Sequence, residues 1–248
     1  MPANCRFLLL ILGFVLSGCV AVNPEKPQNE KASDINVELG IGYLQQENFA
    51  LASEKLQKAL KFNPDSPRAN YVYAILQERL DQKDLAEYHY ERATSLDTKN
   101  AEAANNYGAF LCRNEREAES VKYFLRALDN PLYKTPEFAY TNAAVCLIKI
   151  NEVDEAKGYL KKALAAKSDF ATALLVMADV FFKEENYPAA KKYLDRHQLV
   201  ARPTAKSLWL SIRTALELDA NSNVDELSKL LTSEFPDSEE YQAWLKIQ

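Results

Sequence analysis

The sequence predicts an all-α fold, arranged as a solenoid of about six helix-turn-helix repeats. Small residues recur at three places per repeat, and in each series successive members are 34, 34, 36 and 34 residues apart. Glycine is scarce, with 6 in 248 residues, whereas 48% of the chain is hydrophobic. Small residues let two helices of a hairpin cross closely, and stacked hairpins together bury the apolar face that one hairpin cannot. The first-helix series is Gly40, Ala74, Gly108, Ala144 and Ala178; the two second-helix series are Ala52, Ala86, Ser120, Ala156, Ala190 and Ala59, Ala93, Ala127, Ala163, with His197 as the one exception.

The repeats are expected near 33–66, 67–100, 101–136, 137–170, 171–204 and 205–248. Prolines such as Pro64 end second helices, and Pro188 falls near a helix start, where proline is tolerated. The third repeat is two residues longer, and the two prolines within 130–136 place the extra length there. The sixth repeat keeps a proline at the position of Pro64, because 236 − 64 is 172, or five periods of 34 plus two. A terminal capping helix is expected over 239–247.

The N-terminal segment predicts export. An apolar run of ten residues, Phe7 to Leu16, follows Arg6 and precedes Ser17-Gly18-Cys19. A membrane-spanning helix needs about 20 apolar residues, so the run fits a signal peptide. It resembles a bacterial lipoprotein signal over 1–18, which implies that Cys19 is lipid-modified and that Val20 directs the protein to the outer membrane. The alternative is an ordinary secretory signal with Cys19 as a plain thiol. Residues 19–32 are expected to be a flexible tether.

The repeat pattern resembles the tetratricopeptide repeat. The period near 34, with Gly or Ala and then Tyr or Leu in the first helix, carries this resemblance over residues 33 to about 203. A degenerate unit continues it to the end of the chain. The resemblance implies a right-handed superhelical solenoid whose first helices line a concave groove.

Two cysteines, Cys112 and Cys146, remain in the predicted solenoid. They lie 34 residues apart in the first helices of neighbouring repeats, which run side by side. Because an exported protein meets an oxidising compartment, a disulfide between them is expected. The alternative is a pair of buried free thiols that act as small core residues.

The sequence holds few residues suited to other chemistry. Its two histidines have no ligand partner at suitable spacing, so no metal site is expected. No catalytic signature is present, so the protein is not expected to be an enzyme, and the only cofactor-like group expected is the acyl lipid on Cys19. A net charge of −5 without a basic face disfavours nucleic-acid binding.

A protein-binding groove is therefore the expected functional site. Asparagine holds the backbone of an extended ligand in peptide-binding repeats of this kind, and Asn106 and Asn142 occupy that position, two residues before their small sites. An amide can donate to and accept from a peptide bond at the same time. The alternatives are that these asparagines bond their own scaffold and that the apolar residues belong to the core. The groove residues expected are Ile41, Leu44, Tyr71, Ile75, Asn105, Asn106, Arg113, Asn142 and Lys149, with Glu78 and Arg79 also facing the groove.

The chain as a whole resembles the pilotin lipoproteins of type IV pilus biogenesis, the PilF/PilW family. Moderately specific segments strengthen the resemblance, which otherwise rests on a widespread repeat: 105–112 (NNYGAFLC), 140–146 (YTNAAVC) and 235–241 (FPDSEEY). It implies a monomeric adaptor, lipid-anchored on the periplasmic face of the outer membrane. The adaptor would bind the pilus secretin subunit and promote its outer-membrane localisation and multimerisation.

Two other functions stay open. Outer-membrane lipoproteins with such repeats also act as scaffolds for cell-wall (peptidoglycan) enzymes, and a weaker alternative is an accessory to β-barrel assembly. The sequence also leaves open whether a partner binds the groove or the convex face.

Overall fold

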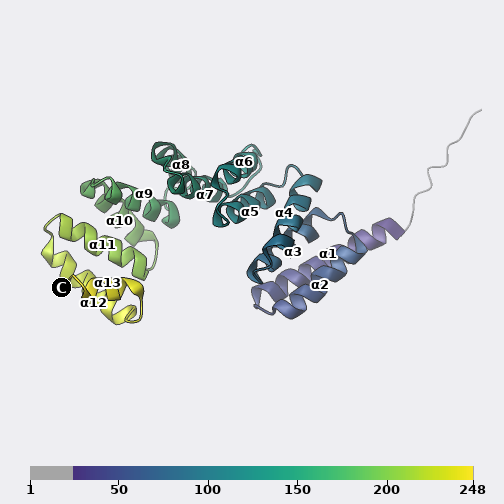
Figure 1. Cartoon of the computed structure of the whole chain (residues 1–248), viewed down its shortest axis with the longest axis horizontal. Helices are drawn as coiled ribbons and strands as arrows, with labels where there is room; N and C mark the ends of the chain where they lie inside the picture. Colours follow the sequence, from purple (N-terminus) through teal and green to yellow (C-terminus); the bar gives the residue numbers. More distant parts are fainter. Residues whose placement is uncertain (1–24, 248) are drawn as a thin grey trace, which may run out of the picture.

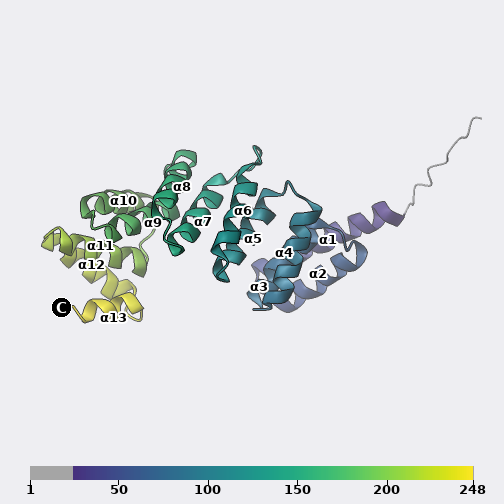
Figure 2. The same ribbon diagram turned by 45° about the horizontal axis from the view of Figure 1, so that its top comes forward.

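The computed structural model describes residues 25–247, which form thirteen α-helices and no strand (Figure 1). This confirms the predicted all-α solenoid, and Figure 2 shows the helix pairs stacked side by side along the molecule. No helix of this range has the length and apolar character needed to cross a membrane. The helices are α1 (Glu25–Gln45), α2 (Phe49–Phe62), α3 (Pro67–Arg79), α4 (Lys83–Leu96), α5 (Ala101–Arg113), α6 (Glu117–Leu128), α7 (Pro136–Lys149), α8 (Val153–Ala166), α9 (Ala171–Lys183), α10 (Tyr187–Val200), α11 (Ala205–Glu217), α12 (Asn221–Glu234) and α13 (Glu239–Leu245).

The first helix is longer than the sequence predicts. It begins at Glu25, so residues 25–32, expected to belong to a flexible tether, are helical. Pro27 is the third residue of α1, and the first four N–H groups of a helix have no partner within it, so a proline there costs no hydrogen bond. The predicted signal peptide, Cys19 and residues 20–24 of the predicted tether lie outside the described residues.

Six residues between paired helices adopt the left-handed conformation, with φ from 53° to 64°. Each precedes a residue whose N–H donates to the carbonyl five residues earlier, as Asn48 does to Tyr43 at 2.9 Å and Ala220 to Ala215 at 2.9 Å. This is the Schellman arrangement that ends many helices. The residues are Glu47, Asp81, Glu115, Asn151, Glu185 and Asp219, so the turn repeats after 34, 34, 36, 34 and 34 residues and includes the sixth repeat.

The paired helices cross at the predicted small residues. A Cβ atom added to Gly40 would lie 2.6 Å from Cγ of Leu56, and one added to Gly108 would lie 2.9 Å from Cε1 of Phe124. Both neighbours are fully buried, as are the alanines of the second-helix series. The small residues are therefore required by the distance between the helices, as their spacing in the sequence predicts.

Successive repeats are joined by arginines at one repeated position on the second helices. Nε of Arg92 donates to the carbonyl of Pro64 at 3.3 Å, Nε of Arg126 to Thr98 at 3.0 Å, and Nη2 of Arg196 to Ser168 at 2.8 Å. Each acceptor lies just past the end of the preceding repeat's second helix, where carbonyls lack helical partners. The sixth repeat has Leu230 at this position.

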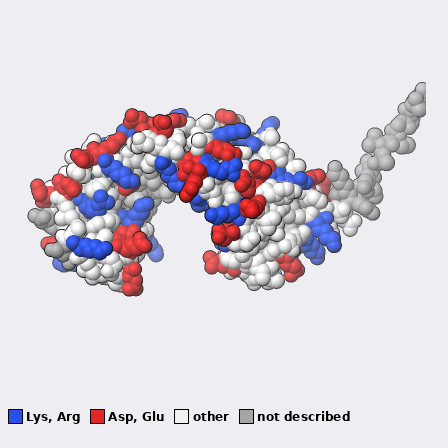
Figure 3. All heavy atoms as spheres, in the orientation of Figure 1, with Lys and Arg blue, Asp and Glu red and all other residues white. Residues whose placement is uncertain are grey.

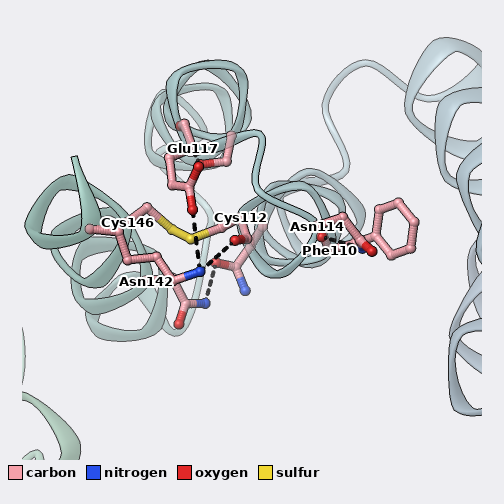
Figure 4. Close-up of a disulfide and its surroundings, with 9 residues drawn as sticks. Phe110, Cys112, Asn114, Glu117, Asn142 and Cys146 are labelled. Atoms are coloured by element: carbon pink, nitrogen blue, oxygen red, sulfur yellow. Dashed lines mark hydrogen bonds and ion pairs between the residues drawn. A yellow bond between two sulfur atoms is a disulfide. The ribbon is translucent and has the colours of Figure 1, made fainter.

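The third and fourth repeats are joined differently. The link from α6 to α7 covers residues 129–135, whereas the links between other repeats have four residues, so the extra length lies where it was predicted. A disulfide joins Cys112 of α5 to Cys146 of α7, with Cα atoms 5.9 Å apart (Figure 4). Both cysteines are buried. A covalent bond therefore holds these two repeats together.

The sixth repeat has lost its small residues. Ile212, Val224 and Leu231 occupy the three positions, and they form one apolar cluster with Trp244 of α13. Trp244 is 8% exposed, and Tyr241 packs against the same cluster. The short α13 thus closes the last apolar edge, as predicted for a capping helix.

Replacing Gly40 by alanine should lower the free energy of unfolding by about 1–3 kcal/mol, because the new methyl group would overlap Leu56. Gly42 is the matched control, since it lies in the same helix and a Cβ there would meet nothing within 4 Å. Gly42→Ala should raise the stability by up to about 1 kcal/mol through helix propensity. Urea unfolding followed by circular dichroism measures both. Equal effects of the two substitutions would contradict the close crossing.

Removing the disulfide with Cys112→Ala and Cys146→Ala together should lower the free energy of unfolding by about 2–4 kcal/mol. The double variant removes both sulfur atoms of this bond, so its stability should not respond to reductant. The unsubstituted protein should fall to a similar stability in dithiothreitol. Guanidinium unfolding with and without reductant tests this, and an unsubstituted protein indifferent to reductant would contradict it.

Candidate protein-binding groove

The molecule is curved into an arch with an open space between its two ends (Figure 3). Acidic and basic side chains are interspersed over the face shown, so no large surface of one sign appears there. A hollow of about 410 Å³ lies where α3 meets α5. It is lined by Ile75, Glu78, Arg79, Tyr90, Asn106 and Arg113. The five first-helix residues of this hollow come from two adjacent repeats and were all expected to face one groove, and the structure brings them together.

Glu78 is the centre of the polar network in this hollow. Nε of Arg113 donates to its Oε1 at 2.9 Å, and the Tyr90 hydroxyl donates to its Oε2 at 3.0 Å. Burial and the adjacent Glu78 carboxylate raise the pKa of Tyr90, so its hydroxyl keeps its proton. Arg113 and Glu78 belong to neighbouring repeats and are 58% and 24% exposed. The network therefore fixes the positions of charged groups at an open surface.

Arg79 lies beside this network without an ion-pair partner among the described residues. Its side chain is exposed. The hollow thus offers one guanidinium that is not neutralised by its own scaffold, which suits an acidic or carbonyl-bearing ligand.

Asn106 donates its amide to the Tyr71 hydroxyl across repeats 2 and 3. Burial raises the pKa of Tyr71 to about 12, so the phenol is neutral and can accept this bond. Oδ1 of Asn106 accepts no hydrogen bond from the described residues. The amide nitrogen of Asn106 is therefore bonded within the protein, in line with the alternative that these asparagines bond their own scaffold. Its carbonyl oxygen remains available to accept from a ligand N–H.

A second polar cluster lies between α5 and α7, beside the disulfide (Figure 4). Nδ2 of Asn142 donates to Oδ1 of Asn105 at 3.0 Å. Nζ of Lys149 donates to the Cys112 carbonyl at 2.8 Å and to Glu117 at 3.3 Å. These expected groove residues come together as a group of their own, and their bonds join repeats 3 and 4.

Two of the expected groove residues are buried. Leu44 is 8% exposed and belongs to the core cluster that includes Val72 and Leu76 of α3, because the second repeat packs over this side of α1. Asn105 is 7% exposed and lies beneath Asn142. Neither presents its side chain as a groove surface. Ile41 is half-buried and packs against the same core cluster as Leu44.

Tyr90 lines the hollow but was not among the expected groove residues. It lies on a second helix, at the position of Leu56 and Phe124, which predicts a core side chain. It is a core side chain by burial, yet its hydroxyl reaches Glu78. Its equivalents in the first, third, fourth and fifth repeats are apolar, so the hydroxyl of Tyr90 was the one feature of the sequence that could have indicated this contact.

The described residues contain no group of three or more His, Cys, Asp or Glu side chains placed to hold a metal ion. What the hollow offers is hydrogen bonding, charge and a small apolar surface at Ile75. These are the means by which a repeat surface binds a polypeptide segment.

Comparison with known proteins identifies the family. A family model described as "Tetratricopeptide repeat" matches residues 37–101 and 144–206. Over 240 residues the chain is 30% identical to the type IV pilus assembly protein PilF of Pseudomonas aeruginosa, covering 95% of each chain. The chain belongs to the PilF/PilW family of tetratricopeptide-repeat proteins.

Solved structures of PilF/PilW proteins agree with this. The structure of P. aeruginosa PilF matches with a TM-score of 0.81 at 30% identity, covering 89% of this chain and 100% of that one. A structure of PilW, described as a widely conserved type IV pilus biogenesis factor, matches with a TM-score of 0.80 at 33% identity, covering 86% and 98%. The relatives are pilus assembly factors, so protein partners in the pilus machinery are implied for this family.

The Glu78–Arg113 pair should couple by about 0.5–1 kcal/mol in a double-mutant cycle with Glu78→Gln and Arg113→Gln, because the pair is partly exposed. Arg79 provides the matched control, since it lies in the same hollow without an ion pair to Glu78. The cycle with Arg79→Gln should give a coupling close to zero. Chemical denaturation of the six proteins measures both cycles, and equal couplings would contradict the network.

Proposed function

We propose that this chain is a pilotin: an outer-membrane lipoprotein adaptor that binds the secretin subunit of the type IV pilus and promotes its localisation and multimerisation. The assignment to a family of pilus assembly factors rests on the similarity to PilF and PilW. The secretin as partner, the lipid on Cys19 and the location on the periplasmic face of the outer membrane are proposals. We propose a monomer that acts without catalysis.

The observation that carries the proposal is the hollow between α3 and α5. It combines Arg79, which has no ion-pair partner among the described residues, the unused carbonyl of Asn106 and the apolar surface of Ile75. A backbone N–H, an acidic group and an apolar side chain of one extended segment could bind these three groups. The inter-repeat bonds of Glu78 and Tyr71 hold the hollow in place before a ligand arrives, which lowers the entropy cost of binding.

The length of the tether supports a role at the membrane. Since α1 begins at Glu25, only five residues separate it from Cys19. Even fully extended, this stretch reaches at most about 20 Å. Lipid on Cys19 would therefore keep the first repeats near the bilayer.

A membrane-held binding surface has a simple mechanism. The acyl chains supply membrane residence, and the groove captures a segment of each secretin subunit. Confinement to one surface raises the local concentration of subunits and so favours their assembly into a ring.

The test is to fractionate membranes from cells that produce Arg79→Glu in place of the native chain and to measure the detergent-resistant secretin multimer. A loss of about tenfold is expected, which corresponds to roughly 1.4 kcal/mol of binding. Lys161→Glu, an exposed charge reversal on α8 away from the hollow, is the matched control and should leave the multimer unchanged. Cys19→Ala should leave the secretin mislocalised.

Deleting the gene gives the decisive contrast. Unchanged secretin location and assembly in the deletion strain would contradict the proposal. If cell shape or septation changed instead, the scaffold for cell-wall enzymes would be the better account.

A further inference from the structure

A cleft is lined by residues of α10, α11 and α12. Figure 1 shows these helices at the opposite end of the chain from α1. It consists of two adjoining hollows of about 190 and 230 Å³ that share Gln198, Ser211, Glu226 and Leu227. Each exceeds the roughly 150 Å³ that suffices for a benzene ring. The cleft is unrelated to the hollow between α3 and α5.

The repeat pattern explains why the cleft is there. The position equivalent to Leu227 holds an aromatic residue in each of repeats 2 to 5. These residues are His89, Tyr123, Tyr159 and Tyr193. These rings pack on rings of the first helices, as Tyr123 does on Tyr107 at 4.5 Å and Tyr193 on Phe181 at 5.5 Å. In the sixth repeat Leu227 stands at the second-helix position, and Ser211 and Ala215 stand at the first-helix positions of Tyr107 and Phe181, so the space that these rings fill is left open.

Two further substitutions change the lining of the cleft. His197 stands where four other repeats have a fully buried alanine, and it lines the cleft while only 5% exposed. Leu230 stands at the position where Arg92, Arg126 and Arg196 bond the preceding repeat. No described residue forms a hydrogen bond to the His197 ring, although it is nine-tenths buried.

The third repeat shows how a phenol is held at the corresponding place. Tyr107, the equivalent of Ser211, is fully buried, and its hydroxyl donates to Oε1 of Glu91 at 3.2 Å. The equivalent of Glu91 is Asp195, which lies on the rim of the cleft beside Lys191 at 2.7 Å. Asp195 can therefore accept a hydrogen bond from a phenol at this place, whereas Ser211 supplies no ring of its own.

We propose that this cleft binds a tyrosine side chain presented by a partner protein. The ring occupies the place that Tyr107 fills in the third repeat, between Leu194 and Leu227, and its hydroxyl donates to Asp195. The partner's backbone runs outside along the exposed rim formed by Gln198, Asn223 and Glu226. Glu226 has no ion-pair partner among the described residues, so a basic residue beside the tyrosine would strengthen binding.

Titration of the purified protein with p-cresol, a model of the tyrosine side chain, tests the proposal. The chain has two histidines, so the NMR signals of the His197 ring report on the cleft and those of His89, bonded to Asn70 in α3, serve as an internal reference. The His197 signals should shift with a dissociation constant on the order of 1 mM, as expected for a fragment of this size. The His89 signals should stay in place. Toluene, which lacks the hydroxyl, should bind about tenfold more weakly.

Two variants separate the cleft from general surface effects. Ser211→Tyr supplies the ring found in the third repeat and should abolish cresol binding while keeping the fold. Asp195→Ala removes an exposed acceptor and should reduce the affinity for cresol to that for toluene. N-acetyltyrosinamide should bind at least as well as cresol, because the open rim leaves room for a peptide backbone.

Several results would overturn the proposal. These are an absence of His197 shifts at saturating cresol, unchanged binding in Ser211→Tyr, or equal affinity for cresol and toluene in the unsubstituted protein. Binding of cresol without binding of N-acetyltyrosinamide would assign the cleft to a small phenol and exclude a partner's tyrosine.

Discussion

The rest of the structure depends on the close crossing of two helices in each repeat, made at a residue with no side chain or one methyl group. At Gly40 and Gly108 the facing Leu56 and Phe124 leave no room for a Cβ atom. Because the crossing is so close, each hairpin is a thin unit with apolar residues on both sides. Such units must stack to bury them, so the local constraint leads directly to a solenoid.

Stacking alone does not determine how one repeat is oriented on the next; polar and covalent links contribute here. The arginines at positions 92, 126 and 196 bond carbonyls past the end of the previous repeat. Between the third and fourth repeats a disulfide and Lys149 make the connection. The bonds of Glu78 to Arg113 and of Tyr71 to Asn106 also join neighbouring repeats, and they lie at the open hollow, so they position the groups available to a partner.

The two ends of the chain illustrate opposite uses of the same plan. In the second and third repeats, aromatic rings occupy the positions equivalent to Ser211 and Leu227. The hollow between α3 and α5 lies where polar groups of these repeats meet at the surface. In the sixth repeat the small residues, the rings and the arginine are all replaced. Its backbone nevertheless repeats the turn at Asp219, and α13 closes its edge through Trp244. Repetition of the backbone thus tolerates loss of the side-chain pattern, and the loss leaves a cleft.

The sequence by itself determined the helical class, the period, the position of the two-residue insertion and the spacing that places Cys112 and Cys146 on adjacent first helices. These follow from side chains that contact residues within one hairpin or at the same place in the next. Only the tertiary structure decided that Leu44 and Asn105 are buried and that Tyr90 reaches Glu78 from a second helix. It also decided that the amide nitrogens of Asn106 and Asn142 donate hydrogen bonds to other residues of the protein. It also showed that residues 25–32 continue α1 and that six non-glycine residues adopt positive φ. The physical reason is that periodicity states which face of a helix a residue occupies, whereas exposure and hydrogen bonding depend on how far the neighbouring repeat covers that face.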